Sequence, residues 1–106
     1  MSLKKSRAWF YFSKYIKARD GNICFICNRT ASGMGLHCGH FIQAFGNQNT
    51  FFDEKNCHSS CYNCNINKYG NILEYRDKIN AKYGKDFDLE LRKRAKIHKS
   101  YTEKEL

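Results

Sequence analysis

Two stretches decide the fold of this chain: LHCGHF at residues 36–41 and NCHSSCYNCN at residues 56–65. The second stretch ends in a Cys-x-x-Cys pair, and another such pair lies upstream of both stretches. Two pairs supply the four thiolates that a closed tetrahedral structural zinc site needs. The interval between the pairs is longer than the roughly 15–20 residues of a short zinc finger, which is tolerable because loop-closure entropy grows slowly with length. The predicted zinc ligands are Cys24, Cys27, Cys61 and Cys64.

Reduced, metal-bound thiols are favoured over disulfides. Six cysteines could form three disulfides in a secreted protein, but the amino terminus has no apolar signal stretch and four of the six lie in Cys-x-x-Cys pairs. A reducing cytosol is therefore predicted. Buried free cysteines or redox thiols are the alternative interpretation of the pairs. Cys38 and Cys57 have no such partner and are interpreted as small core residues.

The composition favours a small domain that binds a polyanion. The 106 residues fit one domain, and 19 Lys and Arg against 10 Asp and Glu give a formal charge of +9. A field of this sign attracts phosphate backbones, although a basic protein without such a ligand is the alternative. The apolar runs are too short to cross a bilayer, so no membrane partner is predicted.

The pattern of the chain predicts an α+β fold in a single domain, residues 1–106. Residues 4–19 carry six basic and no acidic side chains, and Trp9, Phe12 and Ile16 recur at helical spacing. We therefore predict a basic amino-terminal helix there. Three further aromatic residues are expected to broaden its apolar face: Phe10, Tyr11 and Tyr15.

Residues 23–69 are predicted to form the zinc-stapled core, with a strand over residues 36–42, a second short strand around residues 56–58 and a helix entered at Cys61. Residues 71–106 are predicted to be a helical extension. Its first helix runs through Tyr83, and Asn71 with Glu74 three residues later resembles a capping box at its start. Its second helix is indicated by the apolar residues Phe87, Leu91 and Ala95.

Three polar residues lie at fixed offsets from the cysteines: His40 ends an apolar strand, Asn56 precedes Cys61, and Asn65 follows Cys64 directly. Phosphodiester hydrolysis needs a base to activate water and a divalent cation to stabilise the leaving oxygen. A neutral histidine suits the first task. An asparagine carbonyl suits the second, because Mg²⁺ prefers hard oxygen ligands. A single histidine on an apolar strand is more often structural, so the spacing of the whole set carries the prediction.

The pattern Gly39-His40-Phe41 … Asn56-x4-Cys61-x2-Cys64-Asn65-x2-Lys68 resembles the HNH, or ββα-metal, nuclease superfamily in its zinc-stapled form. A more specific resemblance, over residues 8–105, is to the phage lambda NinG/Rap family. It rests on four segments: FSKYI at 12–16, GHFI at 39–42, FDEKNCH at 52–58 and GNILEY at 70–75. That family consists of phage recombination proteins, among them a structure-specific endonuclease acting on Holliday junctions and D-loops.

The resemblance implies a small zinc-stapled ββα-metal core with flanking amino- and carboxy-terminal helices. It implies that His40 is the general base, that Asn65 is a ligand of a catalytic Mg²⁺ or Mn²⁺, and that Asn56 ties the loop between the strands and so orients the histidine. The four cysteines would hold zinc in a structural role, away from the reaction.

One departure from the superfamily pattern concerns the second ligand of the catalytic metal. Many HNH nucleases place an acidic ligand just before the histidine, where this chain has Gly39. His58, Asp53 and His37 are the candidates to replace it. His58 is favoured because on a short strand it would share a face with Asn56. If no protein group fills that place, water would do so or the domain would be inactive.

The expected function is a metal-dependent DNA endonuclease that cuts branched recombination intermediates in the cytoplasm of a bacterial host, encoded by a phage or prophage. A homodimer would provide the two active sites that symmetric cutting needs. The alternatives are a non-catalytic zinc-stapled DNA-binding accessory factor and an HNH homing or restriction nuclease. Tyr62 and Tyr69 are candidates for DNA contact, and the residues expected to bind DNA phosphates are Lys4, Lys5, Arg7, Lys14, Lys17 and Lys68.

Overall fold

A two-stranded antiparallel hairpin lies at the centre of the computed structural model, which describes residues 5–43 and 49–97. Strand β1 (Leu36–His40) pairs with β2 (Cys57–Cys61), so that Leu36 faces Cys61 and His40 faces Cys57. Both strands are where the sequence predicted them. The second strand is longer than predicted, because its pairing continues to the first cysteine of the downstream pair.

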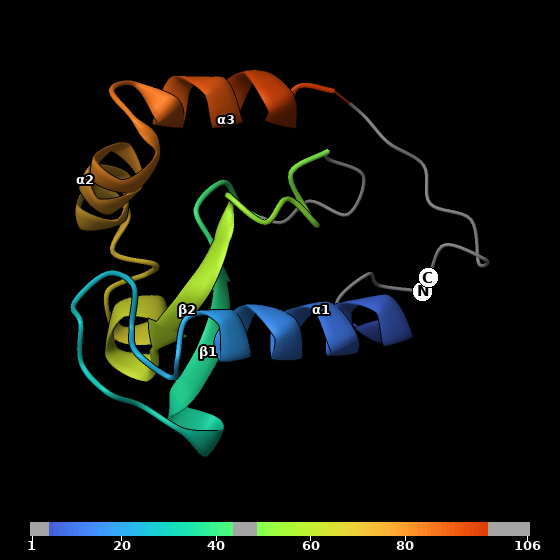
Figure 1. Ribbon diagram of the computed structural model, residues 1–106, viewed down its shortest axis with the longest axis vertical. Coiled ribbons are helices and arrows are strands. Elements are labelled where there is room, and N and C mark those ends of the chain that lie inside the picture. The colour runs from blue at the N-terminus through green and yellow to red at the C-terminus, as the bar shows by residue number, and fades with distance from the viewer. Residues whose placement is uncertain (1–4, 44–48, 98–106) are drawn as a thin grey trace.

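The two faces of the hairpin have different neighbours. Side chains alternate between faces along a strand, so His40 lies on one face while His58, paired opposite Gly39, lies on the other. Helix α1 (Arg7–Arg19) covers the first face, where Trp9 stacks on His40 with ring centroids 4.9 Å apart. Figure 1 shows α1 lying across the hairpin, with α2 at the left and α3 at the top of the view.

Helix α1 is shorter than the predicted 4–19, and only some of its aromatic side chains pack against the rest of the protein. The Ser6 hydroxyl accepts a hydrogen bond from the Trp9 backbone N–H and caps the helix start. Trp9 and Phe12 pack on the rings of the 51–52 segment, and Ile16 is fully buried. The prediction that three more aromatics broaden this apolar face is wrong: more than half of each side chain is exposed for Phe10, Tyr11 and Tyr15.

The segment after β2 is a short π-helical turn, Asn63–Asn67, in place of the predicted α-helix. The Lys68 backbone N–H donates to the Asn63 carbonyl, five residues earlier, at 2.9 Å. This wider turn carries Asn65 out of the cysteine pair toward the outer edge of β1.

Two helices follow, α2 (Ile72–Tyr83) and α3 (Phe87–Ala95), close to the predicted positions. The predicted capping box is absent. Asn71 has a left-handed backbone, with φ of 50°, and its side chain does not cap the helix. Its amide instead lies 3.7 Å from the Cys64 sulfur and 3.3 Å from the Glu74 carboxylate. Residues 98–106 of the predicted extension lie outside the described residues.

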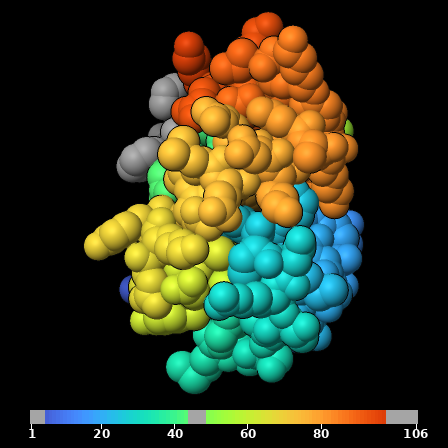
Figure 2. Space-filling model, turned by 90° about the vertical axis from the view of Figure 1, so that its left-hand side faces the viewer, coloured from blue at the N-terminus to red at the C-terminus, as the bar shows by residue number. Residues whose placement is uncertain are grey.

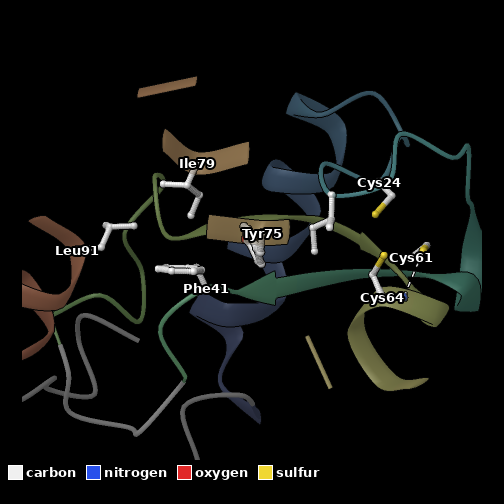
Figure 3. Packing of buried hydrophobic residues seen from close by; sticks show 8 residues of the cluster. Cys24, Phe41, Cys61, Cys64, Tyr75, Ile79 and Leu91 are labelled. Carbon is white, nitrogen blue, oxygen red and sulfur yellow. Dashed lines mark hydrogen bonds between the residues drawn. The ribbon is translucent and has the colours of Figure 1, made fainter. Parts of the chain in front are cut away.

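The core runs from the cysteine sulfurs, at one end of the hairpin, to the two carboxy-terminal helices (Figure 3). Tyr75 and Ile79 of α2 and Leu91 of α3 are fully buried, and Phe41 packs against Tyr75 where the chain leaves β1. This arrangement is a small mixed α/β fold. Within residues 5–43 and 49–97, no helix is both long enough and apolar enough to cross a membrane.

Candidate functional site

The four predicted zinc ligands lie together. The sulfur atoms of Cys24, Cys27, Cys61 and Cys64 are all within 4.8 Å of one another. The Cys27 and Cys61 sulfurs are 3.7 Å apart, close to the separation of about 3.8 Å that zinc–sulfur bonds of about 2.3 Å give in a tetrahedron. The donor set and its spacing fit a structural zinc ion. Figure 3 shows three of these sulfurs converging from the upstream loop, from the end of β2 and from the turn that follows it.

Hydrogen bonds to the sulfur atoms favour the thiolate form of the cysteines in the cluster. The backbone N–H groups of Cys27 and Cys64 lie 3.5 Å from the sulfurs of Cys24 and Cys61. Burial raises the pKa of the Cys61 thiol, but the Cys64 N–H and the neighbouring thiols outweigh it and bring that pKa down to about 7. Burial raises the pKa of Cys64 to about 12. A bound cation would favour the thiolate form of these cysteines.

A cavity of about 340 Å³ opens at the outer edge of β1. Its walls come from the end of β1 and from the π-helical turn, so the cysteine cluster fixes one wall against the other. His40 and Asn65, the two residues predicted to carry the chemistry, both border it. The lining residues are Cys38, Gly39, His40, Gln43, Asn65, Ile66, Tyr69 and Gly70.

His40 is held by its ring nitrogen and by both neighbouring rings. The Nε2 atom lies 2.9 Å from the Phe51 carbonyl oxygen. Since a carbonyl only accepts, Nε2 carries the proton and the basic lone pair lies on Nδ1. The ring is stacked on Trp9 and packed against Phe51. The position of the histidine is thus fixed by α1 and by the 50–52 segment.

Asn56 ties together the two ends of the loop that leaves β1. Its Oδ1 accepts from the Ile42 backbone N–H at 2.8 Å, and its Nδ2 donates to the carbonyls of Ile42 and Thr50 at 3.2 and 3.1 Å. The side chain is fully buried. This pattern holds the segment that carries the Phe51 carbonyl and hence the partner of His40.

Asn65 contacts His37 directly. Its Nδ2 lies 2.8 Å from His37 Nδ1, and its Oδ1 lies 3.2 Å from the position that a Cβ atom would occupy at Gly39. Among the three residues considered as replacements for the missing acid, only His37 therefore touches Asn65. Nothing in the sequence alone distinguished it from the other two.

His58 was predicted to be a metal ligand, but its surroundings are not those of one. It is fully buried on the face away from α1. Its Nδ1 lies 3.0 Å from the Tyr75 hydroxyl and its Nε2 lies 2.7 Å from the Tyr83 hydroxyl, while Phe25 stacks on the ring. Burial, followed by the nearby Arg19 charge, lowers the pKa of His58 to about 3. Both nitrogens are engaged away from the cavity, so the structure does not place His58 as a cation ligand.

Asp53 is also engaged elsewhere. Its carboxylate pairs with Arg94 of α3 at 2.9 Å and accepts from the Lys55 backbone N–H at 2.9 Å. It does not border the cavity. This ion pair fastens the 50–55 segment to α3, which is a structural use of the carboxylate.

The predicted DNA-binding side chains lie at the surface where they are described. Lys17 is half-buried, whereas Lys5, Arg7, Lys14 and Lys68 are exposed. Lys4 lies outside the described residues. Tyr62 and Tyr69 are both exposed, and Tyr69 is 87% exposed at the rim of the cavity. Gln43 and Ile66 complete the walls, and no sequence signal pointed to either.

The comparisons with known proteins agree on one family. The model of the bacteriophage lambda NinG protein family matches residues 3–106. The chain is 29% identical over 72 residues to protein ninG of Enterobacteria phage H19B and 28% identical over 72 residues to that of Escherichia phage lambda. It is 30% identical over 70 residues to protein ninG of Salmonella phage P22.

These matches cover 68%, 68% and 66% of this chain but 36%, 35% and 34% of the respective relatives, so the chain spans about a third of their length. No solved structure matches the chain. The family model matches nearly all of the sequence, and a match of this extent establishes membership. The chain belongs to the bacteriophage lambda NinG family.

Proposed function

We propose that this chain is a metal-dependent DNA endonuclease of the HNH, or ββα-metal, type that hydrolyses phosphodiester bonds in branched recombination intermediates. The observation that carries the proposal is the shared cavity of His40 and Asn65 at the edge of a hairpin held by four cysteines. Hydrolysis of a phosphodiester requires a base and a hard oxygen ligand for a cation, and these two residues border one cavity.

His40 is the general base in this proposal. The Phe51 carbonyl fixes the proton on Nε2, which leaves Nδ1 as the basic atom that takes a proton from the attacking water. Asn56 supports this geometry from the loop. Positioning of this kind matters because a small displacement of a base from its water costs much of the rate.

Asn65 is the proposed ligand of a catalytic Mg²⁺ or Mn²⁺ through its Oδ1 atom. Such a cation, when bound, stabilises negative charge on the scissile phosphate and the leaving oxygen. We leave His58 and Asp53 out of the proposed site, because tyrosine hydroxyls and Arg94 already bind their polar atoms.

The proposed partner is DNA, bound through the basic surface. Lys5, Arg7 and Lys14 on or next to α1 and Lys68 beside the cavity are exposed, and such side chains bind phosphates without reading sequence. Binding of branched DNA by a homodimer would place two cavities on one junction. We expect the protein to act in the cytoplasm of the bacterial host.

A non-catalytic DNA-binding accessory role is the second candidate, and Gly39 favours it because an acidic ligand is missing there. Cleavage of a four-way junction and of a linear duplex of equal length, with and without Mg²⁺ or Mn²⁺, tests the proposal. Cation-dependent nicking of the junction supports it. Binding to both DNAs with no cleavage in either cation supports the accessory role, and cleavage of both DNAs at matched rates favours a homing or restriction nuclease.

A further inference from the structure

We propose that Tyr69 is a stacking platform for an unpaired nucleobase of the DNA strand that is cut, and that this base lies beside the Gln43 amide. The proposal deepens the proposed function, on which it rests, by naming the feature of branched DNA that the site recognises. That feature is a base without a Watson–Crick partner next to the scissile phosphate. A base inside a paired duplex is stacked on its neighbours and has no free face for the ring.

The ring of Tyr69 is presented to solvent at the proposed reaction site. The residue is 87% exposed and borders the same cavity as His40 and Asn65. Single exposed aromatic residues are common on protein surfaces, so exposure alone carries no argument. Here the exposed ring lies beside the residues proposed for the chemistry, where a ligand strand would have to pass.

The backbone at Tyr69 adopts a conformation that is rare for tyrosine. Its φ is 51°, and the next two residues, Gly70 and Asn71, also have positive φ. The Gly70 backbone N–H donates to the Cys64 carbonyl at 2.9 Å, which ties this turn to the cysteine cluster. Left-handed backbone at a bulky residue costs free energy, and such strain gathers at ligand-binding sites. Asparagine or glycine would make the same turn with less strain, so the turn itself does not require a tyrosine.

The lining of the cavity suits an uncharged, planar ligand. None of the described residues that line it is a lysine, an arginine or an acid. Gln43 Nε2 lies 3.9 Å from the position that a Cβ atom would occupy at Gly70, directly after Tyr69. An amide side chain offers both a donor and an acceptor, as does the edge of a nucleobase. Ile66, which is 46% exposed, adds apolar surface to the same walls.

The charge around the rim complements a nucleic acid strand. Residues 55–73, which include the whole π-helical turn, contain no aspartate or glutamate. Lys68, directly before Tyr69, is exposed. A cation for the phosphate and a ring for the base are the two groups that bind single strands. An apolar protein surface would cover the ring but leave the lysine charge without a partner, so an unpaired base is the occupant that both groups favour.

The test measures binding by fluorescence anisotropy in the absence of divalent cation, with protein whose zinc content is verified. The two DNAs are a three-way junction with unpaired bases at its branch point and the same junction with those bases deleted. We expect the wild type to bind the first more tightly. Tyr69→Asn removes the ring and fits the left-handed backbone, so it should melt no lower than the wild type. It should bind the unpaired junction about 5- to 150-fold more weakly, the effect of losing one base–aromatic stack.

A 2-aminopurine among the unpaired bases reports stacking directly. Its fluorescence should be quenched when the wild type binds, the quenching should persist in Tyr69→Phe, and it should be lost in Tyr69→Asn. Tyr11→Ala is the matched control. Tyr11 is 61% exposed on α1 and does not border the cavity, so its loss should leave both the preference and the quenching unchanged.

Three results would overturn the proposal: equal affinity of the wild type for the two junctions, an undiminished preference in Tyr69→Asn, or loss of the preference in Tyr11→Ala alone. Binding of neither junction would also overturn it and leave the ring to a protein partner. Failure of the proposed function is distinguishable, because it appears as absent cleavage by protein that still prefers unpaired bases in a Tyr69-dependent way. Cleavage without that preference would leave the nuclease intact and remove this inference.

Discussion

The two faces of the hairpin use histidine in opposite ways. His58, opposite Gly39 in the register, is fully buried, with a tyrosine hydroxyl on each ring nitrogen. His40, one residue along β1 on the other face, borders the edge cavity and is held through Nε2 by a backbone carbonyl. The same side chain is thus enclosed by aromatic residues on one face and borders a cavity on the other.

The hydrogen bonds around His58 run in one direction and are compatible with the neutral ring that burial favours. The Tyr75 hydroxyl donates to the Gly39 carbonyl at 2.8 Å, so it accepts from His58 Nδ1, and Nε2 is left to accept from Tyr83. A proton on Nε2 would require the Tyr83 hydroxyl to change from donor to acceptor. The covering surface is seen in Figure 2, where α2 and the upstream cysteine loop pack against each other.

The largest expected effect is loss of the whole fold, and with it both faces of the hairpin. Zinc binding in small domains contributes on the order of 10 kcal/mol, which is comparable with the whole stability of a domain this size. We therefore expect Cys61→Ala to abolish zinc binding and cooperative thermal unfolding. Cys38→Ala is the control, because Cys38 lies outside the four-sulfur cluster. A cooperative melt at the wild-type temperature in Cys61→Ala would contradict the structural role of the cluster.

The next largest effect is a pH dependence of stability that comes from His58, on one face only. The pKa of His58 is 6.5 in its ordinary state and about 3 in the folded chain, so the unfolded chain takes up the proton first as pH falls. Its contribution to stability is complete above about pH 7 and is lost between about pH 6.5 and 3, with about 3 kcal/mol gone near pH 4.

His58→Gln removes this proton uptake, and the free energy of unfolding measured by urea should then depend less on pH than in the wild type. Loss of zinc in acid affects both proteins, so the difference between the two curves isolates His58. Parallel curves from pH 7 to pH 4 would show that His58 is not held neutral by the fold.

The smallest expected effect compares two tyrosines. Tyr83→Phe removes the hydrogen bond to His58 Nε2 and should lower the free energy of unfolding by about 1–2 kcal/mol. Tyr69→Phe, at the exposed rim of the cavity, should change it by less than about 0.5 kcal/mol. Chemical denaturation of the two variants checks this order, and equal losses would mean that the buried face is no more tightly constrained than the rim.

The sequence was informative where local chemistry decides the structure. Cysteine spacing predicted the four-sulfur cluster, and helical spacing of apolar residues predicted three helices close to α1, α2 and α3. Side-chain alternation predicted which face of a strand each residue occupies. It could not predict which other elements cover each face. Alternation therefore favours His58 as a ligand, whereas in the structure α2 and Phe25 enclose it.

Two other differences arise from tertiary packing. The π-helical turn at Asn63–Asn67 depends on holding Cys61 and Cys64 at the cluster, which no helix propensity encodes. Asn71 has the spacing of a cap, but the sulfur of Cys64 competes for its amide. The contact between His37 and Asn65 depends on the register of the two strands. That register brings β1 beside the end of β2, and the turn that carries Asn65 follows β2.

The nicking rate of a four-way DNA junction in Mg²⁺, compared between the wild type and His40→Ala at equal zinc content and equal folded fraction, tests the central claim most directly. Loss of a general base typically lowers a rate by about 10²- to 10⁴-fold, and we expect a decrease in that range, with zinc retained. An unchanged nicking rate in the folded, zinc-loaded variant would remove His40 from the chemistry and the edge cavity from the active site.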